Sequence, residues 1–150
     1  MSRTRFDHMQ CGIAQALDVL GDWWTLLIVR DAFFGIRRFA DFQADLGIAK
    51  NVLSDRLNRL VESEILERVD AGTQGTRYEY VLTEKGEALL PVLTSLREWS
   101  DDWVFGRGNE PLVFHDRKSG RRVPRMEVRA ADGRRLGRRD LKAQRGPGAR

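Results

Sequence analysis

The spacing of apolar residues predicts four helices in the first 63 residues. Ile13, Leu17 and Leu20 recur every three to four positions, as on one face of a helix. Gly21 is the expected C-cap of that helix and Asp22 the expected N-cap of the next one. The predicted helices span residues 12–20, 23–34, 38–46 and 49–63. The second has few polar side chains, so we expect a central and mostly buried helix.

The fourth helix is expected to have one apolar and one polar face, and a hairpin pattern follows it. Its apolar row is Leu53, Leu57, Leu60 and Val61. Two strand-like segments, 65–69 and 78–82, are joined by residues 70–77, which contain two glycines. A polar-faced helix before a glycine-tipped hairpin is the outline of a winged helix-turn-helix, in which one helix enters the major groove of DNA. The sequence therefore predicts binding to double-stranded DNA.

A further helix is expected from Thr83, its N-cap, to Phe105, with a kink or break at Pro91. Its apolar row, which includes Leu93 and Leu96, is wider than a small domain needs for its own core. After Gly106-Arg-Gly108, residues 111–130 predict a small β-hairpin with a turn at 118–120, a second turn follows at 132–133, and the end from 145 is expected to be disordered. We predict an α+β, mostly α, fold: a DNA-binding and dimerisation domain at 1–106 and a basic extension at 107–150.

The basic residues are unevenly distributed along the chain. The net charge is +4, but residues 1–110 contain 13 basic and 18 acidic residues, whereas residues 111–150 contain 13 basic and 4 acidic ones. The winged-helix portion must therefore meet DNA with a local basic patch. Two interpretations of the extension stay open. It is either a solvated or dimer-capping hairpin, or a second, sequence-independent clamp on DNA phosphates.

Composition excludes several classes of protein. No apolar run approaches the roughly 18–20 residues of a membrane span, and the N-terminus lacks a secretory signal. The single cysteine fits a reducing compartment, so we expect a cytoplasmic protein associated with the bacterial nucleoid. No Ser/His/Asp set, carboxylate pair or phosphate-binding loop is found. We therefore expect neither an enzyme nor a cofactor.

Four stretches of the chain resemble the HxlR-type transcriptional regulators, a MarR-related winged-helix family. They are residues 11–31, 35–42, 48–60 and 77–86, in the family's order and spacing. The resemblance implies a homodimer built from the first and last helices, one recognition helix per subunit, and a palindromic operator. The chain departs from the family pattern in two places: Ala49 replaces a serine that often caps the recognition helix, and the wing lacks a proline.

The predicted DNA contacts combine the resemblance with the polar face of the fourth helix. The helical candidates are Arg38, Lys50, Asn51, Ser54, Asp55, Arg56, Asn58 and Arg59, and the wing candidates are Thr73, Gln74, Thr76 and Arg77. Arg56 and Arg59 have a second interpretation, as partners of Asp55 or Glu62 in exposed ion pairs.

The extension resembles one that in some relatives forms a zinc ribbon through paired cysteines. Lys118, Ser119, Ala130 and Ala131 stand at those positions here. Zinc needs about four Cys or His ligands and this segment offers only His115, so we expect no metal.

Two features suggest how such a protein is controlled. Cys11, just before the first helix, is either a small residue packed at a dimer seam or a redox-sensing thiol; relatives that sense oxidants or electrophiles have a cysteine at this place. Trp23, Trp24, Trp99 and Trp103 form either core and interface or a pocket for a small aromatic effector. The leading hypothesis is a dimeric, sequence-specific regulator, more specifically a repressor. The alternative is a winged-helix protein-interaction module whose basic tail binds nucleic acid non-specifically.

Overall fold

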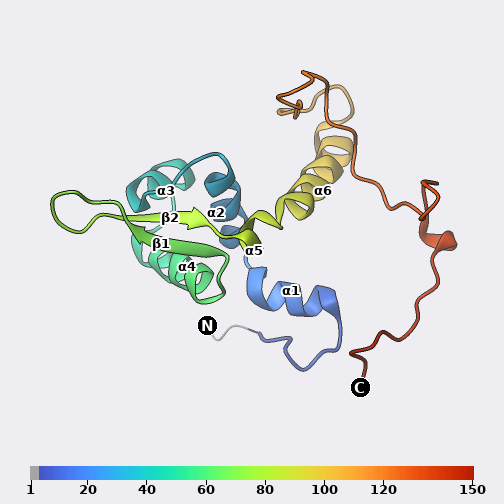
Figure 1. Ribbon diagram of the computed structural model, residues 1–150, viewed down its shortest axis with the longest axis horizontal. Coiled ribbons are helices and arrows are strands. Elements are labelled where there is room, and N and C mark those ends of the chain that lie inside the picture. The colour runs from blue at the N-terminus through green and yellow to red at the C-terminus, as the bar shows by residue number, and fades with distance from the viewer. Residues whose placement is uncertain (1–3) are drawn as a thin grey trace. The chain divides into compact units, whose positions relative to one another are not determined.

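The computed structural model describes residues 4–150. They form two compact units, the first ending at Leu89 and the second spanning Leu90–Arg150. The first unit contains α1 (Gly12–Leu20), α2 (Trp23–Phe33), α3 (Phe39–Leu46), α4 (Lys50–Glu62), β1 (Leu66–Asp70), β2 (Tyr78–Leu82) and α5 (Glu84–Glu87) (Figure 1). These bounds agree closely with the expected ones, and the mostly helical winged helix-turn-helix is confirmed. The expected domain boundary at 106 lies inside the second unit and stays a prediction.

The core of the first unit is made where α2, α3, α4 and the hairpin meet. Its most deeply buried side chains are Ile28, Val29, Phe42, Leu53, Leu57, Leu60 and Leu66. Their burial supplies most of the stabilisation, since a fully buried aliphatic or aromatic side chain contributes about 1.5–3 kcal/mol. The helix α4 is therefore anchored by its apolar row, which fixes the direction of its opposite face.

The expectation that α2 is mostly buried is wrong at its first residue. Ile28 and Val29 are fully buried, but the side chain of Trp23 is 85% exposed. At 100° per residue, Trp23 lies on the opposite side of the helix from those two residues, so the apolar sequence covers more than the face that the core can bury.

The N-terminus of α2 is tied to α4 through one carboxylate. Asp22 Oδ1 accepts hydrogen bonds from the backbone N–H groups of Trp24 (3.0 Å) and Thr25 (2.9 Å), which confirms Asp22 as the N-cap. Its other oxygen, Oδ2, lies 2.8 Å from Nε of Arg56. The cap thus also sets the position of α4 against α2.

Two substitutions at this position separate the cap from the ion pair. Asp22→Ala should lower the free energy of unfolding by about 1 kcal/mol through the lost cap, and further because Arg56 loses one of its two carboxylate partners. Asp22→Asn should lose less, because asparagine caps a helix about as well as aspartate. Urea unfolding followed by circular dichroism measures both. Equal losses in the two variants would show that the cap contributes nothing.

The turn between α3 and α4 requires a glycine, and α4 begins without a side-chain cap. Gly47 has φ +62°, a left-handed conformation that other residues seldom adopt. Ala49 stands at the N-cap of α4 and offers no side-chain hydrogen bond to it. The first N–H groups of α4 are therefore left without a side-chain partner from the cap.

The wing is an antiparallel hairpin whose register pairs Leu66 with Leu82 and Asp70 with Tyr78. The N–H of Tyr80 donates to the carbonyl of Arg37 (2.7 Å), which ties β2 to the segment before α3. At the base of the hairpin, a Cβ on Gly86 would lie 2.2 Å from the carbonyl oxygen of Ile65, so only glycine fits there. The hairpin is thus fixed at its base, while its loop extends away from the helices (Figure 1).

The second unit contains α6 (Leu90–Ser100), the π-helical turn η1 (Asp101–Phe105) that continues it, and the 3₁₀ turn η2 (Arg138–Asp140). The expected break falls just before Pro91, which lies in the first turn of α6, where its missing N–H costs no hydrogen bond. Among the described residues no single helix is long and apolar enough to cross a membrane; α1 and α2 pass that test only together, across a 78° bend.

The turn expected at residues 118–120 is present and His115 pairs with Arg122 across it, but the hairpin is shorter than the expected span of residues 111–130. The extension has two isolated bridges, His115 with Arg122 and Arg129 with Arg135, in place of a continuous ladder. The alternating segment at Met126 does not pair with residues 111–115, because the backbone N–H of Met126 donates to Oε2 of Glu98 on α6 (2.9 Å). Residues 145–150 contain only a turn.

Candidate nucleic-acid interface

The outward face of α4 is a continuous polar surface. It lies opposite the buried row Leu53, Leu57 and Leu60. The exposed side chains on it are Lys50, Asn51, Ser54, Asp55 and Asn58, three to four residues apart. Amide and hydroxyl side chains can pair with base edges, and lysine with a phosphate or guanine. These are the chemical groups that sequence reading in a major groove requires.

The two arginines of α4 are held by carboxylates. Asp55 Oδ2 lies 2.5 Å from Nη1 of Arg56 and 3.2 Å from Nε of Arg59. The side chain of Arg56 is only 22% exposed and also faces Asp22, whereas that of Arg59 is 40% exposed. Arg56 and Arg59 thus form ion pairs with Asp55, as the second interpretation of the sequence expects, and both remain candidates for DNA contact. Arg56 orients α4, and Arg59 is the more accessible of the two to a phosphate.

The backbone of the wing loop is held in place by hydrogen bonds to the carboxylate of Asp70. Asp70 Oδ1 accepts hydrogen bonds from the N–H groups of Gly72 and Arg77, both at 3.0 Å, and the N–H of Ala71 donates to the carbonyl of Arg77 (2.8 Å). A Cβ on Gly72 would lie 2.2 Å from the carbonyl oxygen of Gly75, so the loop needs glycine there. Exposed on this loop are Thr73, Gln74, Thr76 and Arg77.

Two further arginines were missed by reasoning from sequence. Arg68 on β1 is exposed, and its guanidinium lies 4.5 Å from the centre of the Tyr78 ring, so the ring orients it. Arg37 is exposed in the segment that binds β2, next to the half-buried Arg38. Strand alternation places Arg68 on the same face as the buried Leu66, so its basic side chain in the hairpin was the only available signal. Arg37 carried none, because its neighbourhood depends on the pairing with β2.

The residues predicted to sense a signal, Cys11 and the four tryptophans, lie mostly at helix ends and on exposed faces. Cys11 is exposed and occupies the N-cap position of α1, with no side-chain hydrogen bond to the helix. Trp24 is half-buried, whereas Trp23, Trp99 and Trp103 are exposed. Trp23 and Trp24 belong to the first unit and the other two to the second. A pocket formed by all four stays a prediction.

A shallow groove in the first unit reaches the end of α4. It has a volume of about 470 Å³ and is lined by Arg5, Asp18, Val19, Arg59, Glu62 and Ser63. Its charged lining mixes both signs, and one of its residues, Arg59, is also a candidate DNA contact. The arrangement suits water or a small polar molecule better than an apolar one.

Asp31 on α2 is a buried carboxylate outside the exposed polar face of α4. Asp31 is 2% exposed, and burial raises the pKa of its carboxyl, while hydrogen bonds from Arg30 (2.8–3.0 Å) oppose the rise. Arg30 also reaches Asp45 on α3 (3.3 Å). This group links α2 to α3 and has no place in the exposed polar surface.

The extension does not fit a zinc ion. Lys118 and Ser119 lie in a turn closed by Asp116, and Ala130 and Ala131 precede a turn closed by Asp132. Within residues 4–150, no group of three or more His, Cys, Asp or Glu side chains could hold a metal. Hydrogen bonds to aspartate thus shape both turns.

Comparisons with known proteins agree on one family. The sequence model of the HxlR-like helix-turn-helix matches residues 19–107. The chain is 34% identical to the HTH-type transcriptional regulator Rv3095 of Mycobacterium tuberculosis, over 91% of this chain and 86% of that protein.

Solved structures extend the agreement to the fold. The crystal structure of PA1607, a candidate transcription factor, is similar with a TM-score of 0.83 and 44% identity, covering 91% of this chain and 96% of the other. The reduced form of the transcriptional regulator YodB from Bacillus subtilis is similar with a TM-score of 0.56 and 32% identity, covering 63% of this chain and 95% of YodB. Rv3095 and PA1607 thus match the extension as well, since they cover nearly the whole chain.

Proposed function

This chain belongs to the HxlR-like helix-turn-helix family of transcriptional regulators, and we propose that it represses transcription as a homodimer bound to a palindromic operator. One α4 from each subunit would read a half-site in the major groove, with the wing on the adjacent backbone. Occupying a promoter in this way blocks polymerase. We expect the protein to work at the nucleoid, in the cytoplasm.

The observation that carries this proposal is the exposed polar face of α4 beside an anchored wing. Asn51, Ser54 and Asn58 are exposed on a helix whose other face is fully buried, so their direction is fixed before DNA binds. Such pre-organisation limits the entropy lost on binding. Arg77 and Arg68 on the hairpin supply positive charge for the phosphates in a region that is otherwise acidic.

Two exposed apolar rows support the homodimer. In α1, Ile13 is 74% exposed and Leu17 is 48% exposed. In α6 and η1 the exposed row is Val92 (48%), Leu96 (53%), Trp99 (61%) and Trp103 (76%). Apolar rows of this size are seldom left in water. A second copy of the chain is the occupant that also supplies the second reading head of a palindromic operator.

We propose that a signal sets the affinity for DNA, either a small effector or oxidation of Cys11. YodB has been solved in diamide-treated and quinone-bound forms, so a relative of this chain reacts with such compounds. The exposed Cys11 stands at the start of α1, one of the two apolar rows proposed for the dimer. A change there would alter the angle between the two reading heads.

Thiol control predicts a response to diamide that depends on Cys11. Two Cys11 thiols from the two subunits would form one disulfide, and their two hydrogen atoms would pass to diamide. DNA affinity should change several-fold in the wild type and remain constant in Cys11→Ser, as measured by fluorescence anisotropy. Equal responses would contradict thiol control, and no response in either protein would leave a small effector as the signal.

The wing should contribute affinity without sequence preference. Arg77→Ala should weaken binding to operator and scrambled DNA alike and lower the slope of log K against log salt by about 0.9. Arg77→Lys keeps the charge and should retain the wild-type slope. A loss of operator preference in Arg77→Ala would instead assign base reading to the wing.

The proposed function is tested by titrating duplex DNA from the intergenic region upstream of the gene against a scrambled duplex of equal length. Specific regulators prefer their site about 10³–10⁷-fold. A preference of that order with dimer stoichiometry supports the proposal. Equal, weak binding of both duplexes would contradict it and favour the protein-interaction module.

A further inference from the structure

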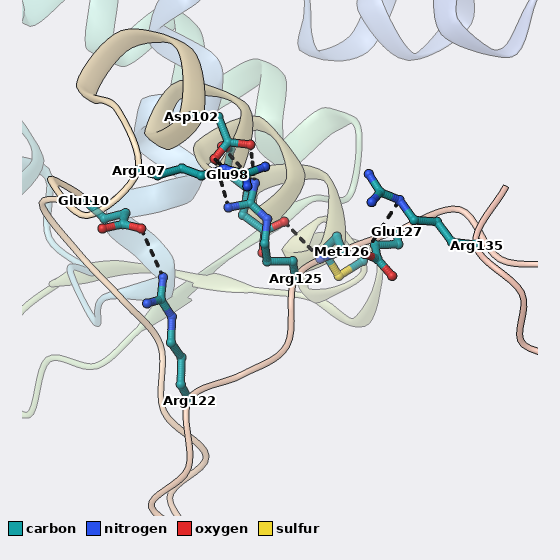
Figure 2. Close-up of polar contacts among 9 residues, drawn as sticks. All are labelled: Glu98, Asp102, Arg107, Glu110, Arg122, Arg125, Met126, Glu127 and Arg135. Carbon is teal, nitrogen blue, oxygen red and sulfur yellow. Dashed lines mark hydrogen bonds and ion pairs between the residues drawn. The ribbon is translucent and has the colours of Figure 1, made fainter. Parts of the chain in front are cut away.

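The basic extension is fastened to the carboxylates of its own unit by a subset of its arginines (Figure 2). Arg125 donates to both oxygens of Asp102, at 3.0 and 2.7 Å, and the neighbouring N–H of Met126 donates to Glu98. Arg107 also reaches Asp102 (3.3 Å), and Arg122 lies 3.4 Å from Glu110. The side chains of Asp102 and Glu110 are only 18% and 13% exposed. With Arg125 40% exposed, the pair between Arg125 and Asp102 is the best shielded from water of the three.

A second subset of arginines is paired within the extension itself. Arg134 lies 2.8 Å from Asp132, and Glu127 faces both Arg129 (2.5 Å) and Arg135 (3.8 Å). With the previous group, these pairs account for most of the carboxylates in and near the extension. The two other carboxylates of the segment, Asp116 and Asp140, accept hydrogen bonds within their own turns, and among the described contacts neither forms an ion pair with a basic side chain.

Six basic side chains remain without a partner among the described contacts, and all six are exposed. They form two clusters, the first being Arg117, Lys118 and Arg121 and the second Arg138, Arg139 and Lys142. The arginines that fasten the extension and those that point to solvent are thus different residues. In Figure 2, Arg125 and Met126 lie beside the helical segment that carries Glu98 and Asp102, whereas Arg122 meets Glu110 between two loop segments.

The first cluster lies on a shaped turn. Asp116 accepts hydrogen bonds from the N–H of Lys118 (3.0 Å) and the hydroxyl of Ser119 (2.8 Å), and its carbonyl accepts one from Gly120 (2.7 Å). The bonds to its carboxylate, first the one from the N–H of Lys118 and then the one from Ser119, lower the pKa of Asp116. Its carboxylate is occupied by the turn and does not pair with the arginines. The second cluster follows Gly137, whose N–H donates to Asp140 (2.7 Å).

We propose that these two clusters bind the phosphate backbone of duplex DNA that flanks the operator, as a sequence-independent clamp. The inference rests on the proposed function, which brings DNA to the same chain. The argument for this proposal is charge complementarity. Six basic side chains without an ion-pair partner, on turns held by hydrogen bonds, complement a regular array of phosphates. The first 110 residues have a net charge of −5, so the extension supplies the positive charge that the reading head lacks.

The test compares three full-length proteins: the wild type, a variant with all six residues changed to glutamine, and a variant with the four arginines of the set changed to lysine. Binding to operator and scrambled duplexes is measured over a range of salt. The glutamine variant should bind both duplexes more weakly, with a slope of log K against log salt lowered by about 0.9 per lost phosphate contact and an unchanged operator preference. The lysine variant keeps the charge and should retain the slope.

Thermal melting of the three proteins controls for folding, and the outcomes separate this inference from the proposed function. An unchanged slope in a folded glutamine variant, with operator preference intact in the wild type, overturns the clamp alone. No operator preference in the wild type overturns the proposed function instead. Tighter binding of single-stranded RNA than of duplex DNA through the same six residues would also overturn the assignment to duplex DNA.

Discussion

Leu96→Glu should produce a monomer that no longer binds a palindromic operator tightly. Leu96 is 53% exposed in the middle of the α6 row, and in the proposed dimer its side chain is covered by the second subunit. A glutamate there would be buried without a partner, which costs several kcal/mol. A monomer has only one α4 and can bind only one half-site at a time, which should reduce operator affinity by about 10²–10⁴-fold.

Analytical ultracentrifugation at micromolar concentration and operator titration measure the two effects together. Leu96→Met is the matched control, because it keeps an apolar side chain of similar volume in the row. It should remain dimeric with near wild-type affinity. A monomeric wild type, or a Leu96→Glu protein that is still dimeric, would contradict the dimer.

Replacing the two asparagines of α4 should remove most of the sequence preference. Asn51 and Asn58 are exposed on the outward face, two turns apart. A base contact by an asparagine contributes about 1–3 kcal/mol of discrimination, so Asn51→Ala and Asn58→Ala together should lower the preference for operator by roughly 30- to 10⁴-fold. Binding to scrambled DNA should change little, since phosphate contacts remain.

Asn109→Ala is the matched control, an exposed asparagine of the second unit that lies outside the interface. Competition titrations with operator and scrambled duplexes give the preference of each protein. An unchanged preference in the double variant would mean that another face of the first unit reads DNA.

The elements of the first unit could be predicted because each has a strong local signal. Leu53, Leu57 and Leu60 mark the buried side of α4, Asp22 is a good N-cap, and Gly47 permits the turn before α4. The outward polar face of α4 follows from its buried row by geometry alone. The role of Arg56 did not follow, because its partner Asp22 is distant in sequence and their approach depends on how α2 packs on α4.

The extension was predicted less well for a physical reason. Alternation of Met126, Val128 and Ala130 favours a strand, but a strand needs a partner, and hydrogen bonds between Met126 and Glu98 and between Arg125 and Asp102 hold this segment instead. Side-chain ion pairs between distant residues leave no periodic pattern in a sequence. For the same reason the division of its arginines into fastening and free groups emerged only from the contacts.

Selection of duplexes from a random-sequence library by the wild-type protein tests the central claim most directly. The account predicts enrichment of an inverted repeat whose half-sites lie about 10–10.5 base pairs apart, centre to centre, as two α4 helices of one dimer require. The Asn51 and Asn58 double variant should enrich no such repeat under the same conditions. A wild-type protein that enriches no sequence, or the same sequence recovered by both proteins, would contradict reading of DNA by α4.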